Sequence, residues 1–210
     1  IFEIIGQTAL YMRGQSFLFD TRDRFDSIFN EARLQIIILQ VAIIGIIALG
    51  VTQVIITAGI DLSSGPLVAA TAMIAMSFAQ TALVNGNPNP KAIFGDWAMD
   101  LPVILPVLIG MTVGVLAGLI NGALIAYTKI PPFIATLGMM VSARGFARWW
   151  SNGNPISFPT EGYNAIGRGM NPVIIFVGLA VLFHLLMTYT KYGKHSYAIG
   201  SNEQATRMSG

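Results

Sequence analysis

One stretch limits what this chain can fold into more than any other. Leu34–Ile60 contains 27 consecutive positions without a charged side chain. The hydrocarbon core of a bilayer is about 30 Å thick and is crossed by about 20 helical residues. The composition agrees, because 54% of the residues are hydrophobic and 10% are charged, against roughly 25% charged in soluble domains. We therefore expect an integral membrane protein in which Leu34–Ile60 is a spanning helix.

Four further segments have the length and polarity of spanning helices. They are separated by two loops rich in Gly, Pro and Asn and by a turn at Lys129–Pro132, where proline lacks the N–H of a helix interior. The predicted fold is all-α, a polytopic transmembrane helical bundle with about five spanning segments. The four further segments are Pro66–Val84, Leu101–Thr128, Phe133–Trp150 and Pro172–Thr190.

The chain divides into three parts. Residues 1–33 form a polar N-terminal segment, and Ile1–Leu10 is compatible with the tail of a preceding helix. Residues 34–190 form the transmembrane domain, and residues 191–210 leave the membrane through a basic cluster into a small, polar stretch. Because the chain opens without a Met and stops inside this polar stretch, we expect a fragment of a longer protein with further helices.

The composition excludes several kinds of chemistry. The chain has no cysteine, so it forms no disulfide, iron–sulfur cluster or thiolate-bound metal site. Its two histidines lack the spacing of a metal site, and the net charge of +2 is too small and scattered for a nucleic-acid binder. Neither a phosphate-binding loop nor a catalytic triad pattern is present. We expect no catalytic residue, metal, cofactor or nucleic-acid partner.

A carboxylate interrupts the apolar sequence within Thr57–Gly65, which reads T-A-G-I-D-L-S-S-G. An ionisable group at membrane depth is costly unless it is paired, capped or hydrated, and two hydroxyls and two glycines surround Asp61. Ser63 or Ser64 is suited to cap a helix that starts near Pro66. Two interpretations stay open here: a capped turn between helices, or a helix break that lines a polar path.

Glycine recurs at every fourth position of the third predicted span, at Gly110, Gly114, Gly118 and Gly122. Small residues on one helix face let another backbone approach closely in a membrane. We expect Gly110, Gly114 and Gly118 to face a neighbouring helix. Tight packing explains the pattern without any role in conduction.

Several short motifs occur in a fixed order from about residue 45 to the end of the chain. They are I-D-L-S-S-G, N-G at Asn121, P-P-F-I-A-T-L-G from Pro131, R-G at Arg144 and Y-A-I-G-S-N-E-Q-A from Tyr197. In this order and spacing the chain resembles the permease subunits of bacterial monosaccharide ABC importers, of the ribose, arabinose, xylose and galactose type, within the branched-chain permease superfamily. It departs from that family's T-G-G-I-D-L-S-V-G signature at Ala58 and Ser64, which are both small.

The resemblance implies a non-enzymatic, multi-pass permease subunit of an ATP-driven importer in the bacterial cytoplasmic (inner) membrane. It implies a path for a monosaccharide or an inositol-like polyol. The implied partners are an ABC ATPase subunit, a second permease copy in a homodimer, a periplasmic sugar-binding protein and membrane lipid. The residues assigned to the translocation path or helix break are Gly59, Asp61, Ser63, Ser64, Gly65, Asn121, Phe133 and Thr136. Those assigned to ATPase coupling are Gly200, Ser201, Asn202, Glu203, Ala205, Ser209 and Gly210.

The coupling segment also has a local physical signature. A basic cluster at residues 191–195 marks the membrane exit. Asn202 is a good helix N-cap, and Glu203 would lie in the first turn, where a negative charge meets the helix dipole favourably. We expect a short helix that starts near Asn202 and places Ala205 and Ser209 on one face.

One rule disagrees with a cytoplasmic coupling segment. If the chain alternates through five spans, four Lys and Arg lie on the coupling side and eight on the other side, whereas cytoplasmic loops normally carry the excess. The ordered motifs outweigh this bias, so we expect the coupling segment on the cytoplasmic side. The four are Lys129, Lys191, Lys194 and Arg207; the eight are Arg13, Arg22, Arg24, Arg33, Lys91, Arg144, Arg148 and Arg168.

Three alternatives stand beside a sugar permease. A branched-chain amino-acid ABC permease shares the architecture, although the I-D-L-S signature favours sugar. An ion-coupled secondary transporter needs no ATPase and would typically carry an ionisable relay in the membrane, for which Asp61 is the one candidate. A purely structural membrane component leaves the motif order unexplained. The sequence does not distinguish pentose, hexose and inositol.

Overall fold

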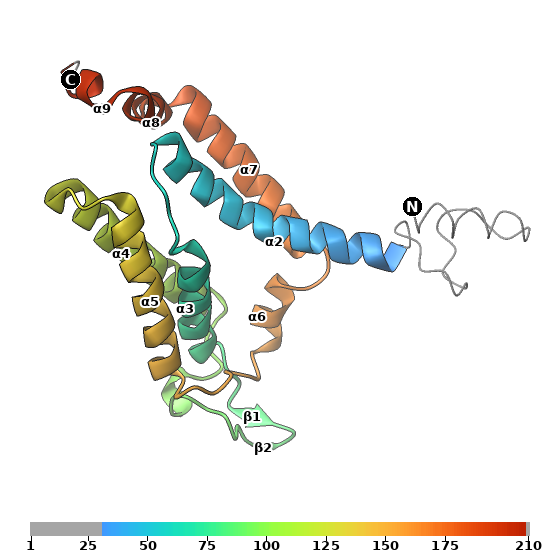
Figure 1. The fold of residues 1–210 in the computed structure, drawn as a ribbon. Coiled ribbons are helices and arrows are strands. Elements are labelled where there is room, and N and C mark those ends of the chain that lie inside the picture. Colours follow the sequence, from blue (N-terminus) through green and yellow to red (C-terminus); the bar gives the residue numbers. More distant parts are fainter. Residues whose placement is uncertain (1–30, 209–210) are drawn as a thin grey trace, which may run out of the picture.

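The computed structural model describes residues 31–208. Almost all of the polar N-terminal segment, and the predicted coupling residues Ser209 and Gly210, lie outside this range. Within this range the regular structure is helical apart from one hairpin with two residues in each strand, so the predicted all-α fold class is confirmed. Figure 1 shows two groups of helices set at an angle, with the hairpin at one end of the molecule and the C-terminal helices at the other.

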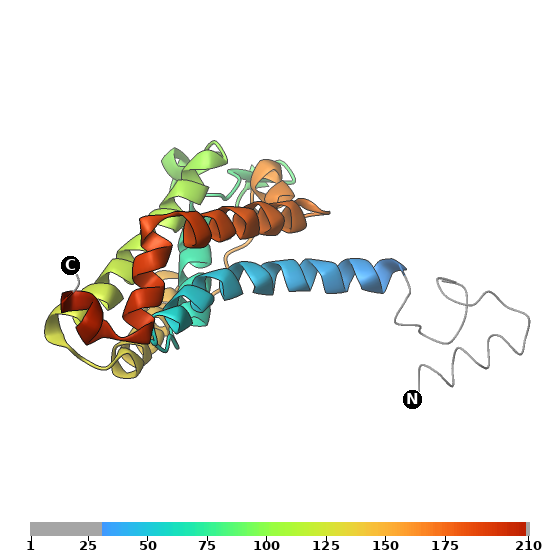
Figure 2. The same ribbon diagram turned by 90° about the horizontal axis from the view of Figure 1, so that it is seen from above.

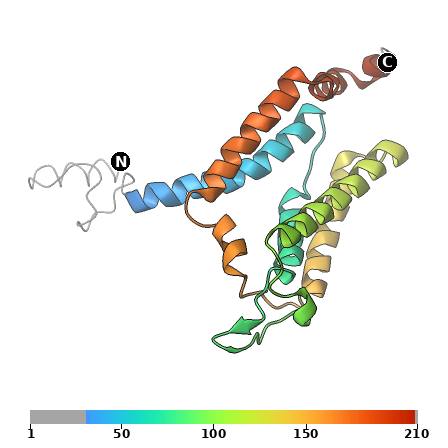
Figure 3. The ribbon, with the colours of Figure 1, turned by 180° about the vertical axis from the view of Figure 1, so that it is seen from behind.

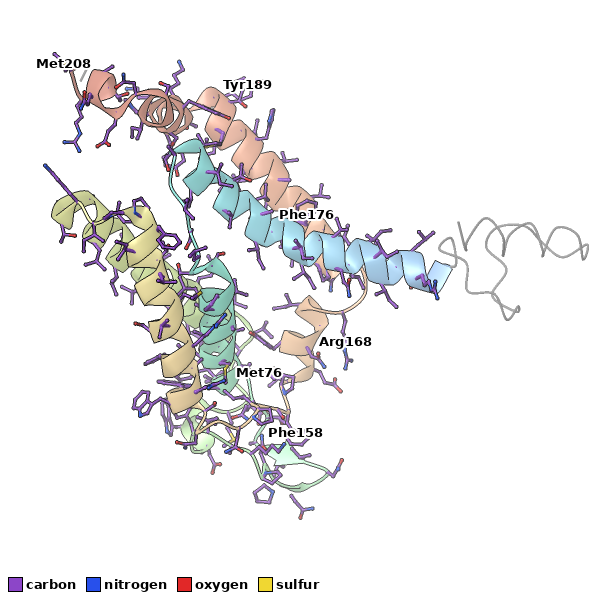
Figure 4. The ribbon with its side chains drawn as sticks, viewed as in Figure 1. Met76, Phe158, Arg168, Phe176, Tyr189 and Met208 are labelled. Carbon is purple, nitrogen blue, oxygen red and sulfur yellow. The ribbon has the colours of Figure 1, made fainter. Side chains whose placement is uncertain are left out.

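The first group consists of α2 (Glu31–Ile56) and α7 (Asn171–Tyr189), which pack side by side. Gly45 allows the two helices to approach closely, because a Cβ added there would meet the ring of Phe176 at 2.5 Å. Phe176 lies on the part of α7 that runs along α2 (Figure 4). A larger side chain at position 45 would therefore require the Phe176 ring to move.

The second group has three helices, of which α3 packs against both others (Figure 3). Ala70, Ala143 and Ala147 are buried together in the contact between α3 and α5. Lys129 ends α4 in the left-handed conformation, and Pro132 begins α5, where a missing N–H is tolerated. The predicted turn between these helices is confirmed. The three helices are α3 (Ser64–Ser77), α4 (Ile104–Thr128) and α5 (Pro132–Trp150).

The glycine face of α4 is directed at α3 over part of its length. A Cβ added at Gly110 would meet the Cβ of Ala75 at 3.0 Å, and one at Gly114 would meet Cγ2 of Thr71 at 3.7 Å. The prediction is confirmed at these two positions. It is wrong at Gly118, where no described atom lies within 4 Å of an added Cβ. A step of four residues overshoots one helical turn by about 40°, so Gly118 has rotated out of the contact.

The second predicted span, Pro66–Val84, is a shorter helix than expected. α3 ends at Ser77 after 14 residues, which corresponds to about 21 Å. Two contacts fix this end: the Trp150 indole N–H donates to the Ser77 hydroxyl at 2.8 Å, and Gln80 forms a β-bridge with Pro159. The non-helical residues between α2 and α3 run from the end of α2 back into the bundle (Figure 1). The segment from the end of α2 to Ser77 therefore consists of a non-helical stretch followed by the short helix α3.

Gln80 organises the loops at the hairpin end of the molecule. Its side chain is fully buried. Its Nε2 donates to the carbonyls of Lys91 (2.8 Å) and Ser157 (2.9 Å), and its Oε1 accepts from the N–H of Ile93 (3.0 Å). These bonds join two loops that are far apart in sequence. The short elements of this region are β1 (Leu83–Val84), β2 (Asn87–Pro88), η1 (Asp96–Ala98) and α6 (Glu161–Ile166).

Three of the described helices are long and apolar enough to cross a membrane. Their side chains are mostly exposed, as with Ile44 (64%) and Ile174 (67%), which suits a lipid-facing surface. Two of the five predicted spans are not among them. α3 is too short to cross a membrane alone, and α5 is less apolar, with Arg144 and Arg148 near its end. The three helices are Arg33–Ile56, Ile104–Thr128 and Asn171–Tyr189.

Two short helices follow α7, namely α8 (Lys191–Ser201) and α9 (Glu203–Met208). α8 turns sharply from α7 and runs across the end of α2 (Figure 2). The corner requires Gly193, because an added Cβ would overlap the carbonyl oxygen of Met187. Both helices lie at the end of the molecule opposite the hairpin (Figure 1).

Candidate functional site

The end of α2 is a Schellman-type cap. The N–H of Gly59 donates to the Val54 carbonyl and that of Ala58 to the Ile55 carbonyl, both at 2.9 Å, which satisfies carbonyls of the last helical turn. Ala58 has a φ of 59°, in the left-handed region that glycine usually occupies. An added Cβ at Gly59 would lie 3.0 Å from Cγ1 of Val54. The helix is interrupted here, as both interpretations of Thr57–Gly65 require, and this cap fixes where the interruption begins.

The Asp61 carboxylate is held by the residue two positions further on. Its Oδ1 accepts from the Ser63 N–H at 2.7 Å and from the Ser63 hydroxyl at 2.6 Å. The prediction that backbone N–H groups or hydroxyls satisfy Asp61 is confirmed. Ser63 is the N-cap residue of α3 but makes no side-chain capping bond. The predicted serine cap is therefore wrong: the Ser63 hydroxyl oxygen accepts from Asn121 of α4 instead of from an N–H of the first turn of α3.

Two neighbouring helices hold the break in place. Asn121 on α4 donates from Nδ2 to the Ser63 hydroxyl oxygen at 3.0 Å. The Thr136 hydroxyl on α5 lies 3.2 Å from the Ile60 carbonyl and 2.9 Å from the Pro132 carbonyl of its own helix, so its proton is shared. Asn121 is 8% exposed, Thr136 is 3% exposed and Ser63 is fully buried. The side chains that join the break to these helices therefore lie inside the bundle.

The two residues that hold the break from α4 and α5 lie within these helices rather than at their ends. Asn121 precedes the last residue of α4 by seven positions, and Thr136 follows the first residue of α5 by four, or about 10 Å and 6 Å along the helix axes. Polar groups at such depth in a membrane face the bundle interior or a water-filled cavity. The arrangement can bind hydroxyl groups by hydrogen bonds.

The predicted path residues do not all meet. Asp61, Ser63, Asn121 and Thr136 share one neighbourhood of hydrogen bonds, and Gly59 belongs to the adjoining helix cap. The other three predicted residues stay outside this network. Ser64 and Gly65 begin α3, and the 49% exposed Phe133 contributes only its carbonyl, 3.3 Å from the Thr136 hydroxyl.

The short helix predicted near Asn202 is confirmed. The Asn202 Oδ1 accepts from the N–H of Ala205 at 3.0 Å, which is the geometry of a helix N-cap, and α9 starts at Glu203. Arg207 pairs with Glu203 at 2.6 Å across one helical turn. The predicted coupling residues Gly200 and Ser201 are the last residues of the preceding helix α8.

Gly200 makes a contact within the chain that sequence reasoning missed. A Cβ added at Gly200 would overlap the carbonyl oxygen of Ile56, the last residue of α2, and would lie 3.5 Å from Cα of Thr57. About two turns earlier on α8, the Tyr192 hydroxyl donates to Oε1 of Gln53 at 2.8 Å. The available signal was an amide side chain close to the end of an apolar helix, where a polar partner is expected.

These features define a class: a helical, multi-pass membrane protein in which one crossing is broken, polar and buried between neighbouring helices. The chain belongs to the family described as "Branched-chain amino acid transport system / permease component", which matches residues 33–210.

Curated relatives narrow the comparison to sugar import permeases. The chain is 37% identical over 181 residues to the ribose import permease protein RbsC of Bacillus subtilis, covering 81% of this chain and 50% of that protein. It is 29% identical to the galactose/methyl galactoside import permease protein MglC of Haemophilus influenzae, covering 100% of this chain and 64% of that protein. It is 32% identical to the ribose import permease protein RbsC of Escherichia coli (strain K12), covering 83% and 51%.

The chain spans about half to two thirds of the length of these relatives. No solved structure matches it.

Proposed function

We propose that this chain is part of the permease subunit of an ATP-driven importer for a monosaccharide or an inositol-like polyol. The subunit performs no bond chemistry and lies in the bacterial cytoplasmic (inner) membrane. The observation that carries the proposal is the broken crossing, in which Ser63 holds Asp61 and is itself held by Asn121. Such a polar passage is costly in lipid, and it is suited to a solute that itself carries hydroxyl groups.

The relatives support the class of solute. Permeases whose names specify ribose or galactose import align with 81% to 100% of this chain. The family match over residues 33–210 includes the Thr57–Gly65 break and the C-terminal helices, and so does the alignment with the galactose/methyl galactoside permease, which covers 100% of this chain. We therefore assign a pentose or hexose, rather than an ion, to the path.

The proposed transporter has three kinds of component: the permease, an ATPase and a binding protein. An ABC ATPase subunit docks on α8 and α9 at the cytoplasmic side, and a periplasmic sugar-binding protein delivers the sugar to the opposite side. A second copy of the permease completes the path as a homodimer. The separation of α8 and α9 from the hairpin loops, at opposite ends of the molecule, supports this assignment of two docking sides (Figure 1).

The deciding experiment is uptake into membrane vesicles combined with purification of the protein and whatever binds to it. We expect ribose or galactose uptake that requires ATP on the cytoplasmic side, and a nucleotide-binding subunit that co-purifies. Uptake driven by an ion gradient without ATP would identify a secondary transporter instead. The absence of any solute uptake, with normal insertion, would leave a structural role.

A branched-chain amino-acid importer is the second candidate. The description of the matched family favours it, while the names of the relatives favour sugar. Competition in the same vesicles separates the two, because unlabelled leucine should leave labelled ribose and galactose uptake unchanged. ATP-dependent leucine uptake would reverse the choice.

A further inference from the structure

One face of α8 is made of small, inward-facing residues. Gly193 and Ser196 are buried, and Gly200 follows one turn later on the same side. The opposite side carries exposed, longer side chains, those of Lys191, Lys194 and His195. The small face is therefore turned toward α7 and α2 of the same chain, and these longer side chains are turned away from them.

Gly200 brings the backbone of α8 against the last residue of α2. The position of the Ile56 carbonyl leaves no space for a Cβ at residue 200. Because the contact joins two backbones rather than two flexible side chains, it transmits displacement with little slack. The packed interior of a protein behaves in this way, with few voids and low compressibility.

A second contact fixes the same two helices side chain to side chain. The Tyr192 hydroxyl donates to Gln53 at 2.8 Å, across 139 positions of sequence. Gln53 lies one turn before the end of α2. Together the two contacts hold α8 against the final turn of α2, immediately before the break begins at Thr57.

The break continues this line of contacts into the second helix group. From Thr57 the chain reaches Ile60, whose carbonyl meets Thr136 of α5, and Ser63, whose hydroxyl meets Asn121 of α4. Two buried polar atoms near this line have no hydrogen-bond partner among the described residues: Gln53 Nε2 and Asn121 Oδ1. Such groups call for an explanation, and an unused donor and acceptor let the side chains exchange partners when the helices shift.

We infer that α8 acts on the polar break through the end of α2, with Gly200 and Tyr192 as the positioning residues of that connection. A displacement of α8 is delivered to Thr57–Ser63, and from there to α4 and α5. This inference rests on the proposed function, since it supplies the internal route by which an ATPase docked outside α8 reaches the sugar path. It also gives Gly200 a contact inside the permease in place of a contact with the ATPase.

The test uses the assembled transporter and two conservative variants. Tyr192→Phe removes one hydrogen bond and keeps the ring, and Tyr197→Phe is its matched control on the same helix. Gly200→Ala adds one methyl group against Ile56, and Gly178→Ala adds one where no atom lies within 4 Å. ATPase co-purification, ATP hydrolysis and sugar taken up per ATP hydrolysed are measured for each variant.

We expect the two test variants to retain the ATPase and its hydrolysis. Sugar taken up per ATP should fall about fivefold in Tyr192→Phe, the value of one hydrogen bond, and about tenfold in Gly200→Ala, which overpacks a tight contact. The controls should stay within about twofold of the wild type. Uptake per ATP at the wild-type value in both test variants would overturn the inference.

A second readout is independent of transport. The chain has no cysteine, so Ile60→Cys, at a side chain that is 55% exposed, provides a single thiol in the break. Its rate of alkylation should change on addition of ATP in an otherwise wild-type transporter, and this change should be lost with Tyr192→Phe or Gly200→Ala. An ATP-dependent change that persists in both backgrounds contradicts the inference even if uptake has fallen.

The outcomes separate this inference from the proposed function. If the wild-type protein neither imports sugar nor retains an ATPase, the proposed function fails. If the wild type transports and Gly200→Ala alone loses the ATPase while Tyr192→Phe changes nothing, Gly200 is a docking contact and only the internal connection fails.

Discussion

Asn121 and Ser63, which are 58 positions apart in sequence, are joined by a 3.0 Å hydrogen bond between the Asn121 amide and the Ser63 hydroxyl. The same hydroxyl donates to Asp61, so one buried serine links a carboxylate in the break to a helix of the second group. The polar break is thus held from two directions, by its own carboxylate and by α4.

The first prediction compares these two anchors. Asp61→Ala leaves both the N–H and the hydroxyl of the fully buried Ser63 without their acceptor, and we expect a loss of stability of about 1–3 kcal/mol. Asn121→Ala removes one interhelical bond, for which about 0.6 kcal/mol is expected in a membrane protein. Thermal unfolding in detergent measures both, and Asp61→Asn, which keeps an acceptor oxygen, is the control. Sugar uptake should fall with Asp61→Ala at normal expression; uptake at the wild-type rate would remove Asp61 from the path.

The second prediction concerns Ala58, whose φ of 59° places a Cβ in the conformation that suits glycine. Ala58→Gly should raise the stability of the folded protein by about 0.5–1 kcal/mol, because the relief of backbone strain exceeds the added flexibility of the unfolded chain. The shift in the unfolding midpoint is the measurement. Ala42→Gly, at a buried helical position of α2, serves as the opposite control and should destabilise. A lower midpoint for Ala58→Gly would show that the left-handed residue is not strained.

The third prediction separates the glycines of α4. Gly110→Leu should destabilise the second helix group by about 1–3 kcal/mol, because overpacking forces α4 away from Ala75 of α3. Gly118→Leu is the matched control, since no described atom lies near an added Cβ there. The two variants are compared by the temperature at which they aggregate in detergent. Equal losses would mean that Gly118 meets a further helix or a second copy in the assembled protein.

The fourth prediction addresses α9. Asn202→Ala removes the cap bond to the Ala205 N–H and should lower the stability of this helix by about 1 kcal/mol. If α9 is part of the docking surface, Ala205→Trp should reduce ATPase co-purification, whereas Asn202→Asp, which retains a capping oxygen, should not. Gly200→Trp is not an equivalent test, because the new side chain would collide with Ile56 inside the permease. Unchanged ATPase binding in Ala205→Trp would exclude this face of α9 from the docking surface and leave α8 as the docking helix.

Sequence reasoning located the break because a lone carboxylate between apolar runs allows few arrangements. It located the Asn202 cap because that signal is local. It misjudged the end of α3, since the bonds that stop this helix come from Trp150 and from the Gln80 loop contacts, which are distant in sequence.

The same limit explains the missed contacts of the C-terminal helices. The family motif identifies Gly200, but nothing in the sequence around it indicates which surface it contacts. The Tyr192–Gln53 pair joins residues near opposite ends of the described chain. Gly118 was misplaced because spacing by four gives a stripe that drifts around a helix, and the sequence does not reveal where the neighbouring helix leaves it.

The separation into two helix groups also determines how mutations combine. Changes in residues without shared partners add, whereas those within one hydrogen-bonded network do not. Gly45→Ala, against Phe176, and Gly110→Ala, against Ala75, lie in different groups. The change in unfolding free energy of the double variant should therefore equal the sum of the two single changes to within about 0.5 kcal/mol. Asp61 and Asn121 both bond to the Ser63 hydroxyl. The change in unfolding free energy of the double variant Asp61→Ala/Asn121→Ala should therefore differ from the sum of the changes in its two single variants. If the two groups are thermodynamically independent and are coupled only at the break, non-additive effects of mutations should be concentrated at Thr57–Gly65.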